Sequence, residues 1–180
     1  MIRQSPYCIQ IELTEGCNLA CSFCGIASIR KNGADGPKDI RGKNSHPYKF
    51  LNWGSALVLA SKIAKVQQEH KWNPRIEMAM HGEPTMNPEY KDIIALLRDK
   101  LPKTHLQMTT NGAGLLKGNL SENINDLMKA GLNVLLLDNY EGIKICDKVR
   151  ENYTGPHPLF EYPLDKKANP HRRRKPTDHD

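Results

Sequence analysis

Residues 8–24 read CIQIELTEGCNLACSFC and join a predicted strand to a loop of cysteines. The short apolar run from Cys8 to Leu13 predicts the strand. Behind it, Cys17, Cys21 and Cys24 follow the spacing C-x3-C-x2-C. Three closely spaced thiolates on one loop can hold three irons of a [4Fe-4S] cluster, which leaves the fourth iron open to chemistry. The spacing therefore predicts an iron-sulfur enzyme.

A structural zinc site is the main alternative for these cysteines. Such a site normally takes four nitrogen or sulfur ligands. Cys8, Cys146 or one of the seven histidines would have to complete it. Zinc ligands usually come as two pairs, however, and the sequence has no second C-x2-C or H-x3-H pair. Disulfides fit poorly, because the five cysteines are an odd number and there is no apolar signal region at the N-terminus.

Phe23 stands directly before the last cysteine, and the loop thereby resembles the C-x3-C-x-aromatic-C motif of the radical S-adenosylmethionine (radical SAM) enzymes. The resemblance implies that Cys17, Cys21 and Cys24 bind a [4Fe-4S] cluster. It implies that S-adenosylmethionine binds the fourth iron through its methionyl amine and carboxylate, with Phe23 near the adenine. An external flavodoxin- or ferredoxin-like donor would supply the electron that splits the sulfonium. The 5′-deoxyadenosyl radical so formed would take a hydrogen atom from the substrate.

Helices and strands alternate along the rest of the sequence. Their periodicity predicts helices over residues 54–70, 87–100, 120–130 and 141–151, and strands over 75–80, 106–110, 132–137 and 159–162. Asn52 or Ser55 is expected to cap the first helix, Pro88 to lie in the first turn of the second, and Ser121 to cap the third. This order predicts an α/β fold in which parallel βα repeats form a partial, TIM-like barrel. The apolar strand 132–137 is expected to lie centrally in the sheet.

The expected domain boundaries follow from the same pattern. Residues 1–153 are predicted to form a radical SAM core, with the cluster loop at 14–27 and a polar insertion at 28–49, and residues 154–180 a Pro-rich, basic C-terminal tail. The full family core has six βα units, whereas this sequence shows four and a short further strand. The sequence therefore predicts either a minimal core or a core that has lost its last units. In the second case, a partner or oligomerisation is expected to close the open side.

Further motifs follow the predicted strands, where parallel α/β sheets place their sites. His81-Gly82-Glu83-Pro84 resembles the GGEP motif of the family, with histidine in place of the first glycine. The resemblance implies that Gly82, Glu83 and Pro84 hold the methionyl amine. An ordinary turn between strand and helix is the alternative interpretation.

Two more strand ends carry polar residues. Thr110-Asn111-Gly112 matches a TNG motif of the family, which implies that Thr110 and Asn111 shape the cofactor pocket, whereas a simple Asn-Gly turn is the alternative. The resemblance places Asp138 and Asn139 near the ribose hydroxyls, although a strand-end Asp can equally cap a helix. Cys8 and Cys146 are expected to be small buried residues.

The net charge of +6 bears on the kind of substrate that the protein binds. Basic residues gather in residues 30–49 and 171–175. Such clusters can bind phosphate groups and indicate an anionic substrate such as a nucleotide or RNA, and a solvated loop and tail is the alternative interpretation. No apolar run is long enough to span a membrane, and we expect a cytoplasmic protein. Two other function classes stay open: an iron-sulfur electron-transfer protein that does not cleave S-adenosylmethionine, and a zinc-stabilised nucleic-acid-binding protein.

Overall fold

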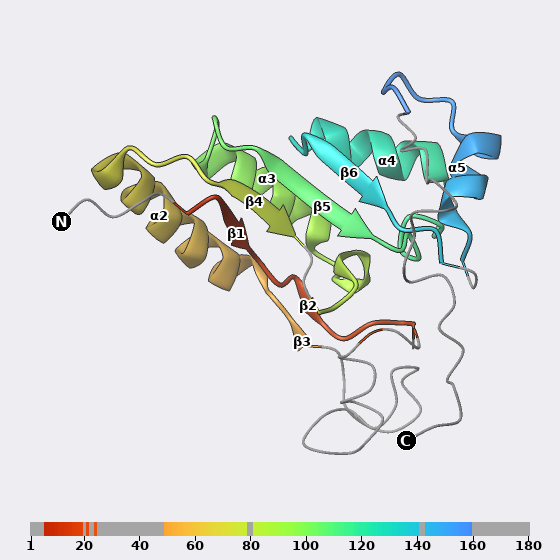
Figure 1. Cartoon of the computed structure of the whole chain (residues 1–180), viewed down its shortest axis with the longest axis horizontal. Helices are drawn as coiled ribbons and strands as arrows, with labels where there is room; N and C mark the ends of the chain where they lie inside the picture. The colour runs from red at the N-terminus through yellow and green to blue at the C-terminus, as the bar shows by residue number, and fades with distance from the viewer. Residues whose placement is uncertain are drawn as a thin grey trace, which may run out of the picture.

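The computed structural model describes residues 6–19, 21, 24, 49–78, 81–140 and 143–159, and its centre is a four-stranded parallel sheet. The strands β1 (Cys8–Gln10), β4 (Arg75–Met78), β5 (Leu106–Thr110) and β6 (Val134–Leu137) lie in the order β1-β4-β5-β6 (Figure 1). All three neighbouring pairs are parallel. Each βα unit therefore adds its strand beside the previous one, as the alternation of strands and helices predicts.

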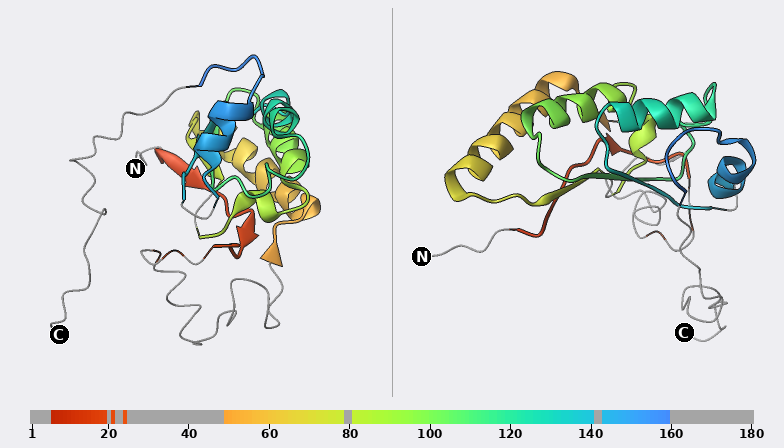
Figure 2. Two further views of the ribbon diagram at one scale, coloured as in Figure 1. Left: turned by 90° about the vertical axis from the view of Figure 1, so that its right-hand side faces the viewer. Right: turned by 90° about the horizontal axis from the view of Figure 1, so that it is seen from above.

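Helices cover one face of this sheet. Figure 2 shows α2 (Trp53–His70), α3 (Tyr90–Lys100) and α4 (Leu120–Lys129) on the same side, with α5 (Ile145–Asn152) beyond β6. The core lies between the sheet and these helices, and its fully buried members include Ile76, Met78, Ile93, Ile94, Leu106, Met108 and Leu127. No helix in the described ranges is long and apolar enough to cross a membrane.

Helix α2 forms where the sequence predicts it. The side chain of Asn52 accepts a hydrogen bond from Ser55 N at 2.8 Å, so Asn52 is the cap. Ala56, Ala60 and Ile63 recur at helical spacing and form the buried face. The helix ends at His70, and the left-handed backbone of the following cap residue, Lys71 (φ 56°), turns the chain toward β4.

The second predicted helix starts later than expected. Pro84–Met86 form a 3-10 turn, η1, and α3 begins at Tyr90 rather than at residue 87. Asn87 lies between the two and is fully buried. Its Nδ2 donates to the carbonyl oxygens of Leu13 and Leu51, and its Oδ1 accepts from Glu89 N. These long-range bonds hold Asn87 outside the helix, and no local pattern in the sequence indicates them.

Three other expectations at element ends and edges need correction. Asn119, not Ser121, caps α4, because its side chain accepts from Glu122 N; the Ser121 hydroxyl donates to the Asn152 carbonyl oxygen instead. Strand β6 is half-buried at the edge of the sheet rather than central. Helix α5 begins at Ile145, later than residue 141.

The first predicted strand, residues 8–13, is split. Within the described residues, β1 ends at Gln10 and a second short strand, β2 (Thr14–Glu15), pairs antiparallel with β3 (Lys49–Phe50). Neither β2 nor β3 is predicted as a separate strand. Of the polar insertion, only Lys49 is described, and residues 79–80, 28–48 and 160–180 lie outside the described residues. Residues 154–159 contain no strand, and the rest of the predicted strand 159–162 is outside them too.

Arg98 ties the amino edge of the sheet together. Its guanidinium donates to the carbonyl oxygens of Gly131, Pro102 and Thr104 at 2.7–3.0 Å and to Asn133 Oδ1 at 2.6 Å. One side chain thus satisfies carbonyl groups at the end of α3 and in the turn between α4 and β6.

Candidate active site at the carboxyl edge of the sheet

The carboxyl ends of β4 and β5 meet at the side chain of Glu83, which is only 3% exposed. Its Oε1 accepts from Thr85 N at 3.0 Å, from Thr85 Oγ1 at 2.6 Å and from Thr110 Oγ1, and its Oε2 accepts from Asn111 N at 2.8 Å. We call Glu83, Thr85, Thr110 and Asn111 the Glu83 hub. It brings together three of the predicted site residues from two separate strand ends.

The side chain of Asn111 connects the Glu83 hub to the cysteine loop by hydrogen bonds. Its Nδ2 donates to Asn18 Oδ1 at 3.0 Å and to Cys17 Sγ at 3.7 Å. Its Oδ1 accepts from Ala113 N at 2.9 Å. The predicted site residues from the β4 loop, the β5 loop and the cysteine loop therefore form one connected network, as the convergence of parallel strand ends predicts.

The β4 loop lies directly on the chain that follows β1. A Cβ atom on Gly82 would lie 1.7 Å from the Thr14 carbonyl oxygen, so only glycine allows this approach. Glu83 N donates to Gly16 O at 2.8 Å. The carboxyl group of Glu12 accepts from the backbone N–H groups of His81 and Gly82 at 2.7 and 3.0 Å.

His81, which departs from the family motif, fits this contact because its Nδ1 lies 3.6 Å from Glu12 Oε2. Pro84 is buried at the first position of η1, where its fixed φ suits the turn. The loop thus accommodates the histidine beside Glu12.

The cysteine loop brings the thiol of Cys17 to this same edge. The Sγ atom of Cys17 accepts from Leu19 N at 3.4 Å as well as from Asn111. Cys24 N donates to Cys21 O at 3.1 Å in a turn that sets the two residues close together. Burial raises the pKa of the Cys21 thiol, and the neighbouring charges of Cys24 and Asp138 raise it further.

The three thiols are not gathered into a ligand set. Across the described residues, no group of three or more His, Cys, Asp or Glu side chains is placed to hold a metal ion. The chemistry of the donor set nevertheless fits an iron-sulfur cluster. All three residues are soft sulfur ligands on one short loop, and the Cys17 sulfur already receives N–H donors that suit a thiolate.

Asp138 and Asn139 lie at the end of β6. Asp138 N donates to Thr110 O at 2.9 Å, which places the residue beside the Glu83 hub. The residue as a whole is exposed, yet the protein atoms around its carboxyl group desolvate it and raise its pKa. Asn139 Oδ1 accepts from Cys146 N at the start of α5, so its carbonyl oxygen supports a helix.

Several residues of the site carry no recognisable sequence signal. Tyr140 donates its hydroxyl to Asp138 Oδ2 at 3.2 Å, and burial together with that carboxyl group raises the tyrosine pKa. The places of Asn18, Glu12 and Thr85 in the site likewise become evident only from their hydrogen bonds in the structure. Phe23 lies outside the described residues. Cys8 and Cys146 are half-buried rather than fully buried.

Comparison with known proteins supports the same family. The model described as the Radical SAM superfamily matches residues 11–138. The chain is 30% identical over 113 residues to a GTP 3′,8-cyclase of Paenarthrobacter nicotinovorans and 24% identical over 111 residues to that of Pectobacterium atrosepticum. These matches cover 61% and 62% of this chain but 26% and 29% of the relatives, so the chain spans about a quarter of their length.

Solved structures show the same fold. The crystal structure of BtrN in complex with AdoMet and 2-DOIA superposes with a TM-score of 0.64 at 16% identity, covering 86% of this chain and 54% of that chain. A structure of selenomethionine BtrN in an open conformation gives a TM-score of 0.58 at 15% identity, with coverage of 83% and 55%. The α/β fold with a partial, TIM-like barrel is thereby confirmed, and the barrel is not closed in the described residues. From its family match, its relatives and its fold, the chain belongs to the radical SAM superfamily of enzymes.

Proposed function

We propose that this chain holds a [4Fe-4S] cluster on Cys17, Cys21 and Cys24 and cleaves S-adenosylmethionine reductively. The observation that carries the proposal is the path of hydrogen bonds from Glu83 through Asn111 to Cys17, because it joins the second family motif to the cysteine loop. When bound, the cluster would supply one electron to the sulfonium, giving methionine and a 5′-deoxyadenosyl radical. The chain's own work is to bind and orient the two cofactors.

Gly82, Glu83 and Pro84 are proposed to hold the methionyl end. Three donors converge on Glu83 Oε1, whereas the described residues provide Oε2 with a single donor, Asn111 N. A carboxyl oxygen offers about two acceptor positions, so Oε2 retains one for an ammonium N–H. The close approach at Gly82 fixes the backbone on which this oxygen stands.

The remaining cofactor contacts are assigned by position. Phe23 would lie against the adenine, and Thr110 and Asn111 would shape the wall of the pocket. Asp138 Oδ2 accepts only one protein hydrogen bond in the described residues, from Tyr140, which leaves acceptor positions for a ribose diol. Asn139 can offer its amide NH2, since its oxygen is used at α5.

The substrate is proposed to be anionic and of the nucleotide class, RNA included. Both curated relatives are named as GTP cyclases, and the basic residues of 30–49 and 171–175 would complement phosphate charge. Reversing the charge of Arg41 and Lys43, which lie outside the described residues, should reduce substrate turnover while leaving substrate-free 5′-deoxyadenosine formation unchanged. Unchanged turnover would contradict the assignment.

Partners and compartment follow from the same chemistry. A reducible cluster needs an external flavodoxin- or ferredoxin-like donor and a reducing compartment, for which we propose the cytoplasm. Within the described residues β6 pairs only with β5, and this free edge supports a partner or a second copy that closes the barrel. Sedimentation of the reconstituted protein tests this, and a fully active monomer would contradict it.

The deciding experiment is an anaerobic one. The protein is reconstituted with iron and sulfide, reduced, and given S-adenosylmethionine, and 5′-deoxyadenosine is measured by mass spectrometry. Cys24→Ala should abolish the product, while Cys146→Ala, on α5 outside the cysteine loop, should retain it. A stable cluster without product would instead favour either the electron-transfer protein or a core that needs its partner or substrate for cleavage. Stoichiometric zinc in place of iron would favour the nucleic-acid-binding protein.

A further inference from the structure

We propose that Asn111 is a positioning residue for the cluster: its side-chain amide fixes the start of the cysteine loop and donates an N–H to the Cys17 sulfur, which tunes the reduction potential of a cluster bound there. This inference rests on the proposed function. It assigns Asn111 a role toward a cluster ligand that goes beyond lining a cofactor pocket.

The hydrogen-bonding partners determine how the Asn111 amide is oriented. Its Oδ1 accepts from Ala113 N at 2.9 Å, which can only donate. The NH2 group must therefore face the cysteine loop. Its nitrogen, Nδ2, donates to Asn18 Oδ1 at 3.0 Å and to Cys17 Sγ at 3.7 Å. This amide group thus holds two consecutive residues of the loop.

Asn111 is itself held rigidly, so it can act as a reference point for the loop. It is 4% exposed, and its backbone N–H is bound to Glu83 Oε2 at 2.8 Å. The next residue, Gly112, has a φ of 78° and packs so closely on Ile145 that a Cβ atom would lie 2.3 Å away. A side chain held between two such neighbours can orient a ligand more exactly than a mobile surface residue can.

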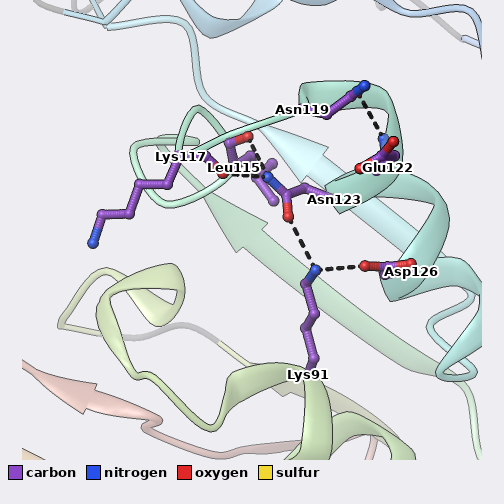
Figure 3. A network of polar contacts seen from close by, with 7 residues as sticks. All are labelled: Lys91, Leu115, Lys117, Asn119, Glu122, Asn123 and Asp126. Atoms are coloured by element: carbon purple, nitrogen blue, oxygen red, sulfur yellow. Dashed lines mark hydrogen bonds and ion pairs between the residues drawn. The ribbon is translucent and has the colours of Figure 1, made fainter.

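The far half of the same β5–α4 loop is fixed separately, which provides a matched control. Figure 3 shows Asn123 of α4 donating from Nδ2 to the carbonyl oxygens of Leu115 and Lys117, both at 2.9 Å. Its Oδ1 accepts from Lys91 Nζ at 3.0 Å, and Lys91 also binds Asp126 at 2.7 Å. Asn123→Ala would loosen this loop without removing the amide that contacts the cysteines.

Hydrogen bonds to cluster sulfur atoms are one of the protein's means of setting potential. Reduction adds negative charge to the cluster and its thiolates, and an N–H donor stabilises that charge. Within the described residues, the Cys17 sulfur accepts from the donors Leu19 N at 3.4 Å and Asn111 Nδ2 at 3.7 Å. Losing the Asn111 donor should therefore make the cluster harder to reduce.

The test compares Asn111→Leu, Asn111→Asp and Asn123→Ala with the wild type in two measurements. In the cluster-free protein, hydrogen exchange of the Cys17–Leu19 amides should speed up in both Asn111 variants and stay unchanged in Asn123→Ala. In the reconstituted protein, a redox titration followed by electron paramagnetic resonance should show a more negative midpoint for both Asn111 variants. The expected change is about tenfold in the one-electron equilibrium constant, equivalent to about 59 mV.

The two arms separate failure of this inference from failure of the proposed function. A wild-type cluster with an unchanged midpoint in both Asn111 variants would overturn the tuning role while the proposed function stands. Unchanged exchange in both variants, or an equal increase in Asn123→Ala, would overturn the positioning role. A wild type that takes up no iron would overturn the proposed function and the tuning role together, and the exchange result would still decide the positioning role.

Discussion

Replacing Glu83 by glutamine tests the Glu83 hub most sharply, because the change keeps the shape of the side chain and alters one acceptor atom. Backbone N–H groups face both carboxyl oxygens, that of Thr85 on Oε1 and that of Asn111 on Oε2. Whichever way the new amide turns, its NH2 opposes a buried N–H that cannot rotate away. An unsatisfied buried donor costs about 1–3 kcal/mol, and weaker bonds to a neutral amide add to this.

We therefore expect Glu83→Gln to lower the free energy of unfolding by about 2–3 kcal/mol, or the melting temperature by about 4–12 °C. Urea unfolding of the cluster-free protein measures it, with an unchanged m-value showing that the unfolded state is the same. Glu69→Gln is the control: its side chain is 52% exposed and its cation, Lys65, is 3.8 Å away, so its loss should stay below about 0.5 kcal/mol. Equal stability of the two variants would refute the hub.

Three further changes probe other parts of the fold. Gly82→Ala puts a methyl group 1.7 Å from the Thr14 carbonyl oxygen, and the backbone shift it forces should cost about 3 kcal/mol in urea unfolding; wild-type stability would contradict the close approach. Arg98→Lys cannot reproduce the fork of hydrogen bonds to backbone carbonyls and should cost about 2 kcal/mol by calorimetry, whereas a loss within experimental error would show that a point charge suffices. The Lys91 hydrogen bond holds the pKa of Asp126 below its ordinary 3.8, so the unfolded chain takes up more protons in acid. The stability from this pair is full above about pH 5 and is lost progressively as the pH falls through 3.8 and then through the lower pKa of the folded state. In a plot of the urea unfolding midpoint against pH, Lys91→Met should reduce the fall of the midpoint in acid. An unchanged fall would show that groups other than this pair cause the loss of stability in acid.

The sequence predicts the parallel sheet and the meeting of its strand ends, because both depend on local periodicity. When strands and helices alternate, the connections between strands are right-handed and the strands run parallel. The residues that follow β4 and β5 must therefore lie at the same edge of the sheet, at the carboxyl ends of the strands. The contact of Glu83 with Thr110 and Asn111 confirms this expectation. The cluster, cofactor and substrate assignments stay predictions.

Features that depend on distant partners were not predictable. Asn87 lies outside the helix because its side chain donates to the carbonyl oxygens of Leu13 and Leu51. Those oxygens are positioned by the pairing of β2 with β3, which is distant from Asn87 in the sequence. The apolar run at β6 resembles a central strand, yet it lies at the edge, because position in a sheet depends on what else pairs with it. The same holds for Asn111, whose amide partners lie in the cysteine loop.

The contact between Asn111 and Asn18 has a consequence for the order of folding. It joins residues 93 positions apart, whereas Asn111 and Glu83 are 28 apart. Loop-closure entropy then disfavours the longer contact by about 1 kcal/mol relative to the shorter one. We expect the Glu83 hub to close first and the cysteine loop to dock last, and by the same reasoning to detach first from the native state. Pulse-labelled exchange during refolding would show late protection of Cys17–Leu19, and protection that appears together with that of β5 would contradict this order. Thiols that remain accessible until the sheet is complete would be available for cluster assembly on a framework that is already folded.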